Sequence, residues 1–324
     1  MTDSSLILAV PSKGRLQENA AAFFARAGLV FVQSRGSRDY RGTLKGVEGV
    51  EVLFLSASEI VTQLATGGAH LGITGEDLVR EQIPNADAAV EMLTPLGFGH
   101  ANVVVAVPQA WIDVRTMADL DEVAADLRAR HGRKMRVATK YVNLTRRFFA
   151  QTGIADYRIV ESLGATEGAP SSGAAELIVD ITTTGSTLAA NALKVLDDGV
   201  ILRSEANLVA SLQAPWSERA RGAVRTVLTR IAAEEEARTS REVRAALDPA
   251  RSGMVQAALQ GFEATLPYGL SAGAELVVHC RSGDAFAVVA ALQGIGARDI
   301  SVRSFDYLFR SANPLSDRLF RRLA

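Results

Sequence analysis

The sequence is poor in the residues that build small disulfide-bonded or zinc-bound modules. Its 324 residues include one cysteine, Cys280, which excludes an intramolecular disulfide framework and any cysteine-rich zinc module. The chain has four histidines: His70, His100, His131 and His279. They lie far apart in the sequence and form no His-x-x-x-His pair, so we expect no dedicated histidine metal site.

Long apolar runs and an excess of charge of one sign are also missing. The apolar stretches, such as residues 6–10, are all far shorter than the run of about 20 apolar residues that a membrane-spanning helix needs. No cationic segment precedes a long apolar one, so we expect no signal peptide, a soluble cytoplasmic protein and no membrane partner. With 35 Lys and Arg against 36 Asp and Glu, the chain has no overall field that attracts nucleic acid.

The first third of the chain alternates short apolar runs with helical spacing. Strands are predicted at 6–10, 50–55 and 70–73, and a stretch with helical periodicity follows each of them. This order predicts a mostly parallel sheet covered by helices on both faces.

The middle of the chain repeats the pattern and predicts a second α/β lobe. The predicted strands lie at 103–107, 135–139, 159–161, 177–181, 200–203 and 207–212. Because this region is entered and left through strands, we expect a cleft between two lobes, in a periplasmic-binding-protein-like arrangement. We assign residues 1–102 and 213–238 to the first lobe and residues 103–212 to the second.

The order changes after a long predicted helix at 217–238. Strands are predicted at 242–247, 264–270, 275–280 and 300–309, with helices from 248 to about 262 and over 284–294. This βαββαβ order predicts a small ferredoxin-like domain within residues 239–324, ending in a tail over 311–324.

The segment with the clearest chemistry is Leu177–Leu188, in which an apolar strand ends in Asp180 and a turn of small hydroxyl residues follows. Gly185 allows a tight turn, and the helix that starts after it offers free N–H groups to an anion. The hydroxyls come from Thr182, Thr183, Thr184, Ser186 and Thr187. Asp180 is suited to ribose hydroxyls or to a magnesium shell. The alternative is an ordinary capped turn that binds nothing.

The residues around this turn resemble the signature of the ATP phosphoribosyltransferase family. The matching positions are Glu167, Gly173, Ala175, Ile178, Asp180, Ile181, Thr184, Gly185, Thr187 and Leu188. Two further segments, residues 8–16 (LAVPSKGRL) and residues 71–77 (LGITGED), are similar to the family's N-terminal basic turn and to its Gly-Ile-x-Gly-x-Asp motif. Together the similar segments span roughly residues 6–212.

The resemblance implies a reaction. N1 of the adenine of ATP attacks the anomeric carbon of phosphoribosyl pyrophosphate and releases pyrophosphate, with Mg²⁺ as cofactor, in the first step of histidine biosynthesis. By the same resemblance, residues 183–187 cradle the 5-phosphate. Asp180 lies near the ribose and touches the metal mainly through the substrate pyrophosphate.

Further site residues follow from the resemblance and from the charges. Lys13 and Arg15 suit pyrophosphate and nucleotide phosphates, because cations at a helix start are unfavourable unless they serve an anion. Glu161 and Glu167 either face the ribose or a metal-bound water, or are surface carboxylates. Gly75 and Asp77 suit an adenine or a ribose hydroxyl, but Asp77 equally fits a plain N-terminal helix charge.

The position and element order of the terminal domain match the family's long form. In long-form relatives this domain binds the feedback inhibitor histidine and the enzyme is hexameric. The resemblance therefore implies a histidine-regulated homo-oligomer.

Two other functions are compatible with the sequence: a non-catalytic two-lobed binding module and a nucleobase phosphoribosyltransferase. A plain solute binder needs no pyrophosphate site, and nucleobase enzymes commonly carry two adjacent acids where this chain has Val179 and Asp180. The chain also lacks a P-loop and a convincing Gly-x-Gly-x-x-Gly turn. ATP that offers its base as a nucleophile requires no P-loop lysine.

Overall fold

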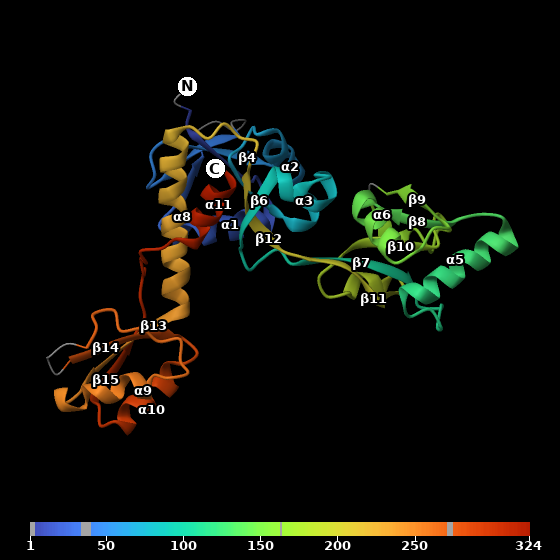
Figure 1. Cartoon of the computed structure of the whole chain (residues 1–324). Coiled ribbons are helices and arrows are strands. Elements are labelled where there is room, and N and C mark those ends of the chain that lie inside the picture. The colour runs from blue at the N-terminus through green and yellow to red at the C-terminus, as the bar shows by residue number, and fades with distance from the viewer. Residues whose placement is uncertain (1–3, 34–39, 163, 271–274) are drawn as a thin grey trace.

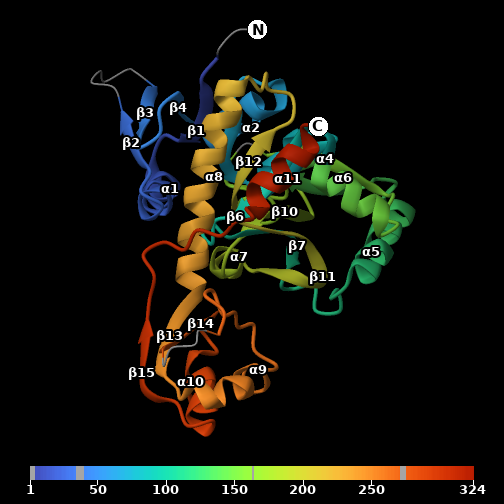
Figure 2. The same ribbon diagram turned by 60° about the vertical axis from the view of Figure 1, so that its left-hand side comes forward.

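The computed structural model describes residues 4–33, 40–162, 164–270 and 275–324, and it arranges them around three β-sheets (Figure 1). Figures 1 and 2 show two α/β lobes, joined to a small terminal unit by the long helix α8 (Glu218–Thr239). The predicted mixed α/β fold with a small terminal sheet domain is confirmed.

The first lobe is built on a seven-stranded sheet in the order β2-β3-β4-β1-β5-β12-β6. Its strands are β1 (Leu6–Pro11), β2 (Val30–Gln33), β3 (Arg41–Lys45), β4 (Val50–Leu55), β5 (Leu71–Gly75), β6 (Val90–Pro95) and β12 (Ala206–Ser211). β1 runs parallel to β4 and β5, so the carboxyl ends of these three strands share one edge of the sheet.

Helices cover both faces of this sheet. α1 (Gly14–Arg26), α8 and α11 (Pro314–Arg322) share one apolar core with β1. The opposite face packs on α2 (Ala57–Thr66), α3 (Glu76–Gln82) and α4 (Ala86–Ala89). A capping box between Ser56 and Glu59 starts α2.

The second lobe has a five-stranded sheet in the order β11-β7-β10-β8-β9. Its strands are β7 (Ala101–Pro108), β8 (Met135–Thr139), β9 (Tyr157–Glu161), β10 (Leu177–Thr182) and β11 (Leu193–Ser204). The helices are α5 (Met117–His131), α6 (Val142–Gln151) and the short α7 (Ser186–Ala190). β8, β9 and β10 are parallel, so Asp180 and the residues that follow β8 and β9 lie at a common edge.

Two chain segments link the lobes, and they pair with each other. Residues 96–100 run from β6 to β7, and residues 204–206 run from β11 to β12. The Leu96 N–H donates to the Ala206 carbonyl and the Ala206 N–H donates to the Phe98 carbonyl, both at 2.9 Å. The crossing is therefore a short hydrogen-bonded ribbon.

The terminal unit has a three-stranded antiparallel sheet, β14-β13-β15. Its elements are β13 (Ser240–Ala246), the 3-10 turn η2 (Pro249–Met254), α9 (Val255–Ala258), β14 (Glu275–Arg281), α10 (Ala285–Gly294) and β15 (Arg298–Arg303). One face packs on α9 and α10, and the other face is polar.

The structure corrects several predicted elements. Within the described residues 264–270 the chain forms no strand but one isolated bridge, Thr265 to His279, and β15 ends at Arg303 rather than at residue 309. The strand predicted over 207–212 belongs to the sheet of the first lobe, not of the second. The tail over 311–324 forms α11, which packs on the first lobe. Strands β2, β3 and β6 were not predicted.

Candidate functional site

Two cations follow the carboxyl end of β1. Lys13 is the N-cap residue of α1 but makes no capping hydrogen bond, and the first turn of α1 contains no acidic residue. Lys13 and Arg15 are both exposed, and neither forms an ion pair or a side-chain hydrogen bond with a described residue. Two unpaired cations beside the positive end of a 13-residue helix favour an anionic ligand.

Asp180 lies at the edge of the second sheet beside a cation that the sequence analysis did not single out. Its Oδ1 accepts the Ile181 N–H at 2.8 Å and lies 3.8 Å from Nζ of Lys140. Lys140 directly follows β8, which is the parallel neighbour of β10. Its position one residue after a predicted strand was the available sign of a role in the site.

The turn after Asp180 is held by its own hydroxyl groups. Gly185 takes a left-handed conformation, with φ of +77°, and its N–H donates to Oγ1 of Thr182 at 2.8 Å. The Thr184 and Ser186 hydroxyls are 3.0 Å apart. Thr187 is exposed in the first turn of α7, where backbone N–H groups have no partner within the helix. The turn therefore presents hydroxyl and N–H donors, as its sequence predicts.

Both halves of the site contact the same interlobe link. The Thr183 hydroxyl donates to the backbone carbonyl of His100 at 3.0 Å. One residue earlier, a Cβ added at Gly99 would lie 3.2 Å from Cδ1 of Leu16, which follows Arg15 in α1. Leu16, which follows the basic turn, and Thr183 of the hydroxyl turn therefore contact neighbouring residues of the link.

Glu161 and Glu167 occupy different positions. Glu161 is exposed at the carboxyl end of β9, in register with Thr139, the residue before Lys140. Glu167 is half-buried in the 3-10 turn η1 (Thr166–Gly168). Neither carboxylate forms an ion pair with a described residue.

Asp77 faces the protein interior. Its side chain is buried, Oδ2 accepts the Tyr141 hydroxyl at 2.8 Å, and Oδ1 accepts the Ser204 hydroxyl at 2.9 Å. A Cβ added at Gly75 would lie 2.2 Å from Oδ1 of Asp77, so this glycine leaves room for the carboxylate to fold back over the end of β5. Of these two predicted site residues, Gly75 rather than Asp77 lies at the open edge of the sheet.

The described residues gather no cluster of three or more His, Cys, Asp or Glu side chains that would hold a metal ion. Within the same part of the chain, no helix has the length and apolar character needed to cross a membrane.

Comparison with known proteins identifies the family. The family model described as ATP phosphoribosyltransferase matches residues 56–233. The ATP phosphoribosyltransferases of Afipia carboxidovorans and Nitrobacter winogradskyi are 59% and 58% identical over 97% and 98%, respectively, of both chains. The solved ATP phosphoribosyl transferase (HisG:HisZ) complex from Thermotoga maritima aligns with a TM-score of 0.53 and 25% identity, covering 70% of this chain and 96% of that one. The chain belongs to the ATP phosphoribosyltransferase family, whose members are enzymes of histidine biosynthesis.

Proposed function

We propose that phosphoribosyl transfer takes place beside the interlobe link at residues 99–100, with phosphoribosyl pyrophosphate held between the two lobes. The 5-phosphate occupies the turn over 183–187, the ribose lies beside Asp180, and Lys13 and Arg15 bind the pyrophosphate. The observation that carries this proposal is the contact of both turns with one link, through the Thr183 hydroxyl on His100 and through Leu16 against Gly99.

The charges suit the bonds that change. N1 of adenine forms a bond to the anomeric carbon of the ribose, while the bond from that carbon to the pyrophosphate oxygen breaks and its electron pair leaves with pyrophosphate. Lys13 and Arg15 stabilise the charge that develops on the leaving group, and the Asp180 carboxylate stabilises the oxocarbenium-like ribose. Lys140 lies 3.8 Å from Asp180 and orients this carboxylate.

The remaining carboxylates take lesser roles in this proposal. Glu161 and Glu167 face the ribose or a metal-bound water from the second lobe. Gly75 lines the half of the site that belongs to the first lobe. Asp77 contacts no substrate, because both its oxygens are already bonded within the protein.

The residues present fit a magnesium ion that arrives with the substrate. Mg²⁺ is commonly bound through one or two carboxylates together with substrate phosphates, and it keeps several waters. Asp180 is the carboxylate in the right place, because its Oδ2 accepts no hydrogen bond from a described residue. The ion would neutralise pyrophosphate charge and assist its departure.

Arg15→Ala tests the basic turn. We expect kcat/KM to fall by about 10-fold or more for both substrates, because a charge-assisted contact of about 1.5–3 kcal/mol is lost. Steady-state kinetics with each substrate varied in turn measure the effect. Lys45→Ala is the matched control, since this exposed cation lies on β3 at the opposite edge of the sheet. Unchanged KM and kcat in Arg15→Ala would mean that the turn is only a helix start.

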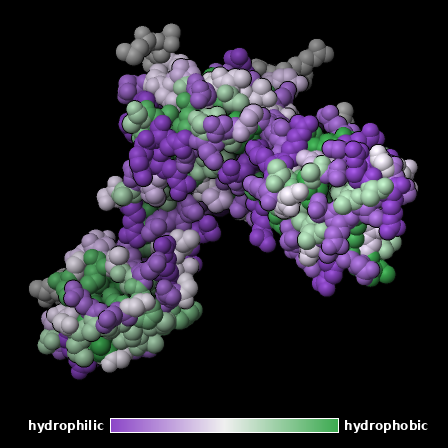
Figure 3. Space-filling model, turned by 45° about the vertical axis from the view of Figure 1, so that its right-hand side comes forward, coloured by the Kyte–Doolittle hydropathy of each residue, from purple (hydrophilic) through white to green (hydrophobic). Residues whose placement is uncertain are grey.

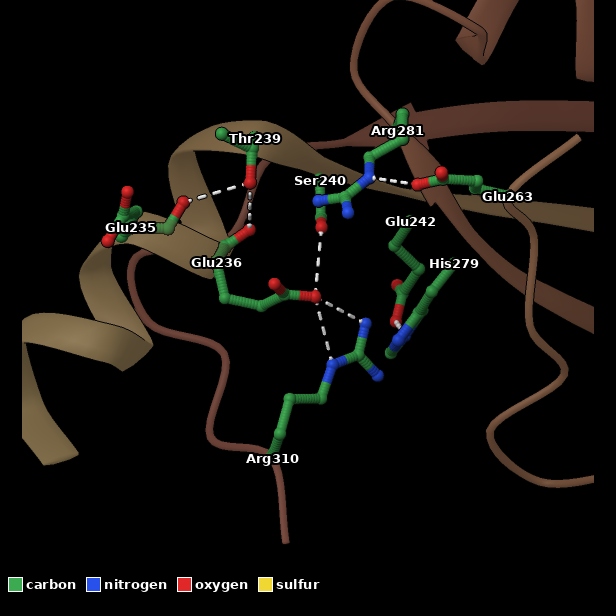
Figure 4. Close-up of polar contacts among 9 residues, drawn as sticks. All are labelled: Glu235, Glu236, Thr239, Ser240, Glu242, Glu263, His279, Arg281 and Arg310. Carbon is green, nitrogen blue, oxygen red and sulfur yellow. Dashed lines mark hydrogen bonds and ion pairs between the residues drawn. The ribbon is translucent and has the colours of Figure 1, made fainter. Parts of the chain in front are cut away.

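We also propose that the terminal unit binds histidine as a feedback inhibitor. A cavity of about 460 Å³ lies where the end of α8, β13, β14 and the segment that returns from β15 meet. Figure 4 shows the Arg310–Glu236 and Arg281–Glu263 pairs around it. Groups of both signs are what the ammonium and carboxylate of a free amino acid require.

His279 supports a ligand in this cavity. Its ring is buried, and neither ring nitrogen has a hydrogen-bond partner among the described residues; the nearest carboxylate oxygen, Oε2 of Glu242, is 3.6 Å from Nε2. Burial, with Arg310 nearby, holds the pKa of the imidazole below its usual range, so the ring is neutral at pH 7. A neutral imidazole without partners is costly to bury, and a polar ligand would relieve that cost.

Arg281→Ala tests the inhibitor site in the full-length chain. Calorimetric titration should show histidine binding to the wild-type protein and binding at least ~10-fold weaker in the variant. Arg298→Ala, an exposed arginine at the start of β15, should bind like the wild type. Histidine binding that is equal in all three proteins would remove the cavity as the site, and its absence from the wild type would remove the regulatory proposal.

We infer that the chain forms a homo-oligomer, with a hexamer as the family's long form implies. Apolar residues gather on the face of the terminal unit that Figure 3 displays. On α10 the Phe286 side chain is 86% exposed, which is unusual for a large apolar residue in a monomer and supports a subunit contact through this helix.

A further inference from the structure

A buried hydrogen-bonded cluster joins the two lobes at their link. The Tyr141 hydroxyl donates to Oδ2 of Asp77 at 2.8 Å, and the Ser204 hydroxyl donates to Oδ1 of the same carboxylate at 2.9 Å. The Asp77 N–H donates to the Ser204 oxygen at 3.0 Å. The three residues are 2% (Tyr141), 7% (Asp77) and 4% (Ser204) exposed.

Each member of the cluster belongs to a different part of the molecule. Asp77 lies in α3 of the first lobe, Tyr141 is the N-cap residue of α6 in the second lobe, and Ser204 ends β11 where the chain returns to the first lobe. The three hydrogen bonds that Asp77 makes therefore fix the two lobes and their link relative to one another.

A neighbouring contact strengthens this junction. The Glu81 carboxylate of α3 accepts the backbone N–H groups of Asn143 and Leu144 at 2.9 Å each, where α6 begins. An acidic side chain from one lobe thus caps a helix of the other. α3 and α6 are held side by side along this edge.

Tyr141 is suited to act as a permanent donor. Burial, together with the adjacent Asp77 carboxylate, raises the pKa of its hydroxyl, so the proton stays on Tyr141. The preceding residue is Lys140, whose Nζ lies 3.8 Å from Asp180 and 5.3 Å from the centre of the Tyr141 ring. Lys140 is therefore connected to the cluster both through the chain and through its contact with the Tyr141 ring.

We propose that Tyr141 is a positioning residue for phosphoribosyl transfer: through Asp77 and Ser204 it sets the angle between the lobes at which Lys140 and Asp180 face the basic turn of β1. It makes no contact with substrate. The inference rests on the proposed location of the site, since positioning matters only where both lobes hold one substrate.

Tyr141→Phe tests the inference, because it removes one oxygen and leaves the buried ring. We expect kcat/KM for phosphoribosyl pyrophosphate to fall by about 10-fold or more, since the hydrogen bond to a carboxylate is lost. Tyr157→Phe is the matched control: its hydroxyl is in the same lobe and has no hydrogen-bond partner among the described residues. Ser204→Ala should also lower kcat/KM for phosphoribosyl pyrophosphate, as Tyr141→Phe does.

A distance measurement separates positioning from general damage. The spin labels are attached to two introduced cysteines, Lys45→Cys on the first lobe and Glu122→Cys on the second. Both positions are exposed, whereas the native Cys280 is buried. The label distance distribution should be narrow in the wild type and in Tyr157→Phe, and should shift or broaden in Tyr141→Phe.

The outcomes are distinguishable. A kinetic defect with an unchanged distribution would overturn the positioning role. A changed distribution with normal kinetics would overturn it as well. If the proposed location of the site is wrong, Arg15→Ala will have normal activity. The distance measurement does not depend on that result, so it can still be interpreted.

Discussion

Asp180→Asn should lower kcat/KM by at least ~10²-fold, or about 2.7 kcal/mol of transition-state stabilisation, while the protein folds normally. The change keeps an oxygen that can accept the Ile181 N–H, so the local backbone is retained. It removes the negative charge that faces Lys140 and, in the proposed site, the developing positive charge of the ribose. Initial rates at varied phosphoribosyl pyrophosphate, with saturating ATP and Mg²⁺, measure the loss.

A matched variant isolates the position of the charge. Asp197→Asn removes an exposed carboxylate of the same lobe that pairs with Arg115 at 2.9 Å, away from the end of β10. Its kinetics should match the wild type, because exposed ion pairs contribute little. Near-wild-type turnover of Asp180→Asn would contradict the assignment of the turn over 183–187 to the substrate.

The sequence was most informative where buried strands lead into turns with chemistry. β1, β5, β8 and β10 are short apolar runs, and each is followed by residues of the candidate site. Parallel pairing then gathers these ends at the edges of two sheets, which is why the motifs could be interpreted before the structure was known. Lys140 was not predicted as a site residue because it lies in none of the segments that resemble the family, although it directly follows a predicted strand.

The strands at and next to one edge of the sheet, β2 and β3, were the least predictable part of the first lobe. In β2 the side chains of Val30 and Val32 are exposed, and β3 alternates buried and exposed residues. Neither strand is a continuous apolar run, so composition does not distinguish either of them from a loop. In the terminal unit, the expected strand over 264–270 contains Pro267 and Gly269, which weaken ladder pairing and leave one bridge at Thr265.

Contacts between distant segments could not be predicted at all. Asp77 reads equally well as a ligand-binding residue or a helix-start charge, and its partners Tyr141 and Ser204 are 64 and 127 residues away in sequence. Packing of the two lobes decides between these interpretations. The same holds for α11, whose amphipathic pattern does not say which domain it covers.

The terminal helix is an integral part of the first lobe. Asn313 caps it by accepting the N–H groups of Leu315 and Ser316, and Pro314 occupies its first turn. Leu315 and Leu319, four residues apart, enter the core that α1 and α8 share. Outside the core, the Arg318 guanidinium donates to the Met92 and Leu93 carbonyls of β6, at 3.2 and 3.0 Å.

Leu319→Ala should therefore lower the free energy of unfolding of the first lobe by about 2–5 kcal/mol, as removal of a fully buried leucine leaves a cavity that the core fills only in part. Arg321→Ala, on the exposed side of the same helix, should change it by no more than about 0.5 kcal/mol. Trp216 packs against this core and Trp111 against that of the second lobe, so urea unfolding followed by Trp216 fluorescence in a Trp111→Phe background reports the first lobe alone. Equal, small shifts in both variants would mean that α11 lies on the surface without stabilising the lobe. A large shift confined to Leu319→Ala would explain why a chain cut ahead of the terminal unit is a poor test of the proposed regulation: the cut removes part of the core of the first lobe together with the terminal unit.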